Sequence, residues 1–136
     1  MLTTFDAPEA STACTRRERS NTPLQALTLL NDPSFVEAAR VFASNLLTPA
    51  NQTDEQRLTA AFERALVRPP KNREKESLLK FLAEQRQHYT EESDEASQLQ
   101  KVGFAKAPEK IAPVELAAWM QVCRVILNLQ ETVTRY

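Results

Sequence analysis

Apolar residues recur at intervals of three and four along most of the chain, which is the spacing of one face of an α-helix. The clearest stripe lies in residues 33–47, where Phe35, Ala39, Phe42 and Leu46 are flanked by Val36, Ala43 and Leu47. A stripe this wide predicts a well-buried helix. Narrower stripes predict further helices over about 23–31, 55–67, 73–90, 94–102 and 113–130. No segment shows sustained alternation with a period of two, so we expect no β-strand.

Polar residues and prolines mark the expected helix ends. Thr22, Asp32, Thr53 or Asp54, and Asn72 are expected to cap the first four helices. Pro23, Pro33 and Pro113 suit the first helical position, where the missing N–H costs nothing. Gly103 is expected in the left-handed conformation that ends the short helix.

The pattern as a whole predicts an all-α fold, a compact set of about five helices joined by short loops. Residues 1–20 have no clean period and are expected to be an irregular, arginine-containing segment, followed by helices over 21–136. The chain has one glycine and eight prolines in 136 residues. Scarce glycine favours helices over sheets, because sheets need glycine in turns and bulges. The length fits a single domain.

The charge balance argues against several classes of partner. The net charge is −1, which gives no global attraction to nucleic acid or to an anionic membrane. Residues 23–31 and 33–47 resemble a helix-turn-helix in spacing, but Arg40 is the only cation of the second helix, so we expect no DNA binding. No apolar run is long enough for a membrane span, and no signal peptide is visible.

The two cysteines leave two interpretations open. Cys14 and Cys123 do not form a C-x-x-C pair, and the chain has one histidine, so we expect no metal site and no covalent haem in this chain. Both thiols could be buried, as cysteines often are. They could instead form a Cys14–Cys123 disulfide in an oxidising compartment, which would tie the N-terminal segment to the last helix.

The strongest candidate site is the basic segment of Arg16, Arg17 and Arg19. Three guanidinium groups just before a helix N-terminus could bind a carboxylate, a phosphate or an acidic sugar. The alternative is that they pair with carboxylates of the domain, such as Asp6 or Glu18, and only fix the loop.

Three amides bracket the helix that follows this segment: Asn21, Gln25 and Asn31. They could line a cleft beside the arginines, or cap helices and satisfy loop backbone. His88 is expected at the surface, and Trp119 in the core. No nucleophile motif or catalytic set is apparent.

Two stretches carry a family resemblance. Phe5–Pro8 together with Cys14–Pro33 is similar to the C-terminal part of a domain of unknown function, the PSD domain of planctomycete-type proteins associated with cytochrome c. Glu115–Trp119 and Ile126–Arg135 resemble the end of the same domain. The family more often has an Asp-Glu-Phe-like sequence where this chain reads Gln130-Glu131-Thr132.

The resemblance implies a longer, exported protein with upstream domains, often including a c-type cytochrome domain that carries haem c. It also implies a periplasmic or extracellular location, and that Met1 is an internal start or the chain a truncated form. No catalytic residue can be transferred from the family.

Three functions follow as hypotheses. The first is a non-catalytic helical part that forms a domain interface or an anion-binding cleft, with upstream domains, an acidic ligand or a glycan as partner. The second is part of an extracellular oxidoreductase or polysaccharide-processing enzyme whose catalytic groups lie upstream. The third is a stand-alone helical adaptor.

Overall fold

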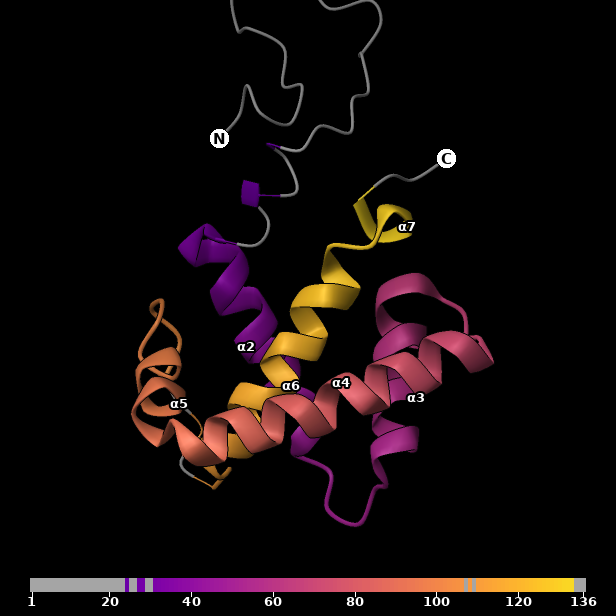
Figure 1. Cartoon of the computed structure of the whole chain (residues 1–136). Coiled ribbons are helices and arrows are strands. Elements are labelled where there is room, and N and C mark those ends of the chain that lie inside the picture. Colours follow the sequence, from indigo (N-terminus) through magenta and orange to yellow (C-terminus); the bar gives the residue numbers. More distant parts are fainter. Residues whose placement is uncertain (1–23, 25–26, 29–30, 107, 109, 134–136) are drawn as a thin grey trace, which may run out of the picture.

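Figure 1 shows the chain in a computed structural model, which describes residues 24, 27–28, 31–106, 108 and 110–133. Within these residues there are six helices and no strand, so the all-α prediction is confirmed. The helices are α2 (Pro33–Leu47), α3 (Asp54–Leu66), α4 (Asn72–Glu91), α5 (Ser93–Leu99), α6 (Pro113–Leu127) and α7 (Gln130–Val133). The predicted helix over 113–130 is divided: α6 ends at Leu127, and Thr132 Oγ1 donates to the Ile126 carbonyl 2.7 Å away as α7 begins.

Several predicted helix starts are confirmed by their hydrogen bonds. Asp32 accepts from the Ser34 N–H at 2.9 Å, with Pro33 at the start of α2. Thr53 and Gln56 form a reciprocal capping box at the start of α3. Capping of this kind satisfies N–H groups that have no partner within the helix.

Two predicted ends are wrong. Asn72 is not the cap of α4: Lys71 occupies that position, and the Glu74 side chain accepts from the Lys71 N–H at 2.7 Å. Gly103 does have a positive φ of 86°, but α5 ends earlier, at Leu99. The glycine is needed in the following loop instead, because an added Cβ would lie 2.3 Å from the side chain of Glu37.

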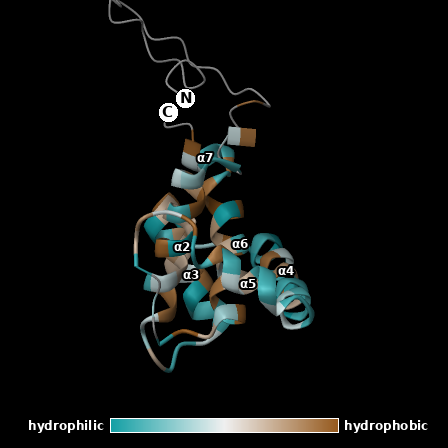
Figure 2. Cartoon of the chain, turned by 90° about the vertical axis from the view of Figure 1, so that its left-hand side faces the viewer, coloured by the Kyte–Doolittle hydropathy of each residue, from teal (hydrophilic) through white to brown (hydrophobic). Residues whose placement is uncertain are grey.

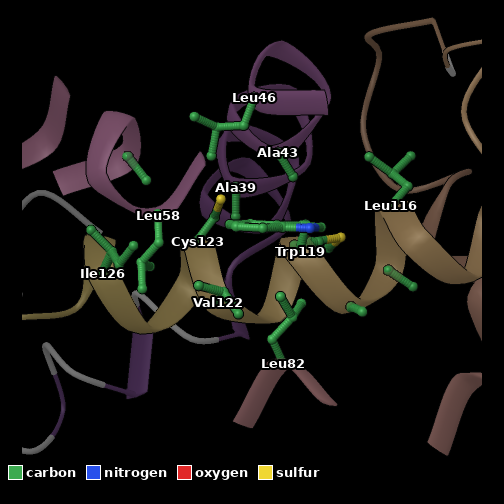
Figure 3. Close-up of a cluster of buried hydrophobic side chains, with 14 of the residues drawn as sticks. Ala39, Ala43, Leu46, Leu58, Leu82, Leu116, Trp119, Val122, Cys123 and Ile126 are labelled. Atoms are coloured by element: carbon green, nitrogen blue, oxygen red, sulfur yellow. The ribbon is translucent and has the colours of Figure 1, made fainter. Parts of the chain in front are cut away.

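The hydrophobic core is built around α6, which contacts each of the other five described helices and lies at the centre of Figure 1. Buried side chains surround most of α6, as expected for a helix enclosed by others. Figure 3 shows Trp119 of α6 beside Ala39 and Ala43 of α2, with Leu82 of α4 on the other side. Trp119 is fully buried, as predicted.

The buried face of α2 is turned relative to the predicted stripe. Phe35 and Phe42 are only partly buried, whereas Ala39 and Ala43 are fully buried. Small residues at this face let α2 lie close to α6, and the large ring of Trp119 fills the space beside them. None of the described helices is long and apolar enough to cross a membrane.

We expect Ala43→Leu to destabilise the protein by about 1–3 kcal/mol, because added methylenes have no space between α2 and α6. The matched control is Ala38→Leu, an exposed alanine of the same helix, which should change stability by less than about 0.5 kcal/mol. Urea unfolding followed by the emission of Trp119, the only tryptophan, measures both. Equal stability of the two variants would contradict this packing.

Candidate functional site

Most of the predicted site lies outside the described residues. This applies to Arg16, Arg17, Arg19, Asn21 and Gln25, and also to Cys14. Asn31 is described: it is exposed, and its Nδ2 donates to the Leu27 carbonyl at 3.2 Å. This hydrogen bond satisfies a backbone carbonyl one helical turn earlier. A role of Asn31 in binding stays a prediction.

Two exposed leucines lie directly after the arginine segment. Leu24 and Leu27 are helical, and 59% and 55% of their surfaces are exposed. The sequence pattern places both on one side of the predicted helix 23–31. None of the described elements covers that side. Figure 2 shows the described residues before α2 as mainly hydrophobic.

Arg86 of α4 joins three helices through two carboxylates. Its Nη1 and Nη2 donate to both oxygens of Asp54 at 2.6 and 2.9 Å, and its Nε donates to Glu115 at 2.9 Å. Glu115 also accepts from the indole N–H of Trp119 at 3.1 Å. Hydrogen bonds to the Arg86 guanidinium lower the pKa of Asp54, and the two carboxylates raise the pKa of Arg86. This cluster is satisfied internally, so it fixes helices rather than awaiting a ligand.

Arg68 forms a second cluster between the end of α3 and α7. It makes two hydrogen bonds to Glu74, at 2.9 and 2.8 Å, and two to Glu131, at 2.8 and 3.1 Å. Its guanidinium carbon also lies 5.4 Å from the centre of the Phe62 ring. The hydrogen bonds from Arg68 lower the pKa of Glu74 to about 2. Sequence reasoning missed this cluster, because Glu131 lies 63 positions away from Arg68.

Arg40 is the largest surprise of the structure. It lies on the apolar face of α2, is only 1% exposed, and donates from Nη2 to the Ala105 carbonyl at 2.6 Å. One turn earlier, Glu37 accepts from the backbone N–H groups of Phe104 and Ala105. Together these side chains hold the loop after α5 against α2. In the sequence, the only sign of this role of Arg40 is its position as a cation between apolar residues of the predicted stripe.

Two further titratable groups that the sequence singled out, His88 and Cys123, are described by the structure. His88 is about half exposed, as predicted, and its Nε2 lies 3.3 Å from Glu95. Cys123 is a fully buried thiol whose pKa is raised by burial. Cys14 lies outside the described residues, so a disulfide between the two stays a prediction. Within the described ranges, no group of three His, Cys, Asp or Glu side chains could hold a metal ion.

Comparison with known families assigns the chain. Residues 1–82 match PSD1, described as a protein of unknown function (DUF1553). The chain belongs to the PSD1 family. The match covers the arginine segment, α2, α3 and the first half of α4, and it ends before the stretch from Glu115 to Arg135, whose resemblance stays a prediction. No curated protein and no solved structure matches this PSD1 chain.

The Arg68 cluster predicts loss of stability in acid. The pKa of Glu74 is about 2 in the folded protein against an ordinary value of 4.5. The contribution of ionised Glu74 to the free energy of unfolding is therefore present above about pH 4.5 and is lost as the pH falls toward 2. Glu74→Gln should lower stability at neutral pH by about 1 kcal/mol and flatten the pH dependence below 4.5. Urea unfolding at a series of pH values measures this. Glu76→Gln, an exposed neighbour on α4, is the control, and an unchanged pH slope in Glu74→Gln would contradict the assignment.

Proposed function

We propose that the N-terminal end of this chain is a domain interface within a longer PSD1 protein. Arg16, Arg17 and Arg19 would bind carboxylates of an upstream domain there, or the acid groups of a ligand or glycan. The observation that carries the proposal is the exposure of Leu24 and Leu27, directly after the arginine segment.

The physical argument rests on what interfaces contain. The core of a protein–protein interface is more apolar than the rest of the surface, and arginine is enriched at interfaces. Burial of each leucine against another domain would stabilise the complex, because apolar surface is removed from water. The arginines Arg68 and Arg86 already bind two carboxylates each, so they do not compete for this role.

Binding in trans tests the interface. The upstream part of the same reading frame, expressed separately, should bind the 136-residue chain in calorimetry. Leu24→Gln/Leu27→Gln should weaken binding at least about tenfold, because two apolar contacts are lost. The triple Arg16/Arg17/Arg19→Ala variant should also weaken binding. The loss of affinity should be larger at low salt than at high salt, because salt screens the charge attraction.

Val67→Gln is the control for the leucines, because Val67 is 90% exposed and lies at the end of α3. It should bind as the unaltered chain does. Unfolding of the triple arginine variant would show instead that the arginines pair within the chain. A stop codon just before Met1, or no binding of the unaltered chain, would overturn the interface and favour the stand-alone adaptor.

We further propose that the longer protein is exported to the periplasm or beyond and carries haem c in a separate domain. The family resemblance of Cys14–Pro33 supports this. We expect the native protein to be larger than the 15.4 kDa of this chain and to show a c-type haem absorbance spectrum. A native mass equal to that of the chain, without haem absorbance, would overturn the proposal.

A further inference from the structure

One polar stripe of α4 faces solvent along the whole length of the helix. Its residues recur at intervals of four and three, which places them on one side of an α-helix. All of them are exposed: Arg73, Ser77, Lys80, Glu84, Gln87 and Glu91. The buried residues of α4, Leu82 and Tyr89, lie on its opposite side. Figure 2 shows α4 at one side of the molecule, coloured mainly as hydrophilic. This stripe is therefore accessible to a partner.

The charges of the α4 stripe are arranged symmetrically about its middle. Lys80 lies two positions before Leu82, and Glu84 lies two positions after it. Arg73 and Glu91 lie nine positions before and after the same residue. Each cation thus has a carboxylate at the mirror position. A second copy of the stripe, turned end to end, would place each cation beside a carboxylate, whereas a parallel copy would place like charges together.

The two end charges of the stripe do not stabilise their own helix. Arg73 is the second residue of α4 and Glu91 is the last, and the helix dipole disfavours a cation at the N-terminus and an anion at the C-terminus. Arg73 forms no ion pair with another described residue, and Glu91 accepts a hydrogen bond from Gln87 at 3.1 Å. The backbone positions of Arg73 and Glu91 are about 27 Å apart along the helix, so the two side chains cannot pair within one chain.

The two central charges are paired only loosely within the chain. Lys80 Nζ lies 3.9 Å from Glu84, and 80% and 60% of these side chains are exposed. An exposed pair of this kind contributes little to stability. Both groups can therefore turn toward charges of another molecule at small cost.

We propose that two copies of this chain associate through their α4 stripes, with the helices antiparallel and a two-fold axis at the level of Leu82. Arg73 of each copy binds Glu91 of the second copy, and Lys80 of each copy binds Glu84 of the second copy. Because the same surface is used on both sides, each ion pair occurs twice. A second copy is the partner that the charge order favours, because the stripe is complementary to itself.

The character of the stripe sets the strength of this dimer. A stable protein interface buries about 800 Å² per partner, which is more than one polar helix face offers. The attraction comes from exposed charges, so it is weakened by salt. The dimer is therefore weak and salt-sensitive. It is independent of the interface proposed at the N-terminal end.

Sedimentation equilibrium of the chain, at up to about 1 mM protein because small interfaces are weak, tests the dimer. The unaltered chain should dimerise at about 20 mM salt and lose the dimer at about 0.5 M salt, where exposed charges are screened. Arg73→Glu should raise the dissociation constant of the dimer at least about tenfold, because two attractive contacts become repulsive. Glu91→Arg should have the same effect for the same reason.

The double variant Arg73→Glu/Glu91→Arg tests the antiparallel order. Each reversed charge then faces a reversed charge of the second copy, so every pair is attractive again. The net charge also returns to −1, that of the unaltered chain. The double variant should therefore dimerise within about threefold of the unaltered chain. Failure of the double variant to recover the dimer would overturn the proposal.

Matched controls separate the stripe from other causes. Lys101→Glu changes the net charge by the same amount as Arg73→Glu at an exposed position after α5, and it should dimerise as the unaltered chain does. The emission of Trp119 checks that every variant is folded. A chain that is monomeric at low salt, or a dimer that Arg73→Glu leaves unchanged, would overturn the proposal. A dimer that only Leu24→Gln/Leu27→Gln abolishes would also overturn it, and would place self-association at the N-terminal end.

Discussion

The burial of α6 is the constraint on which the rest of this structure depends. Every other described helix contacts α6, and Trp119 fills the space between it and α2. Trp119 also takes part in a polar cluster, because its indole N–H donates to Glu115, which also binds Arg86. Through Arg86 and Asp54 the same chain of hydrogen bonds reaches α4 and the start of α3. Hydrophobic burial and one polar cluster therefore fix the same helices relative to each other.

Arginine has three different roles in this protein, and its surroundings decide which one applies. Arg68 and Arg86 each bind two carboxylates and join distant helices. Arg40 is buried and holds a loop through a backbone carbonyl. The arginines before residue 20 precede a pair of exposed leucines, and for them we propose a role in binding. A planar group with five donors suits all three roles, so residue type alone does not distinguish them.

The N-terminal end of the chain is the surface that we propose to bind another domain. The N-terminal end offers leucines beside arginines, which suits another protein domain. The loop after α5 is held in place by Glu37 and Arg40 of α2.

The sequence by itself determined the helical class, most helix ends and the burial of Trp119, because spacing and capping act over a few residues. It also pointed to the family through Cys14–Pro33. Only the tertiary structure decided which face of α2 is buried, why Gly103 is needed, and which carboxylates bind Arg68 and Arg86. Those outcomes depend on partners as far apart as Glu37 and Phe104 or Arg68 and Glu131. A local pattern carries no information about such pairs, because folding brings them together only when the helices pack around α6.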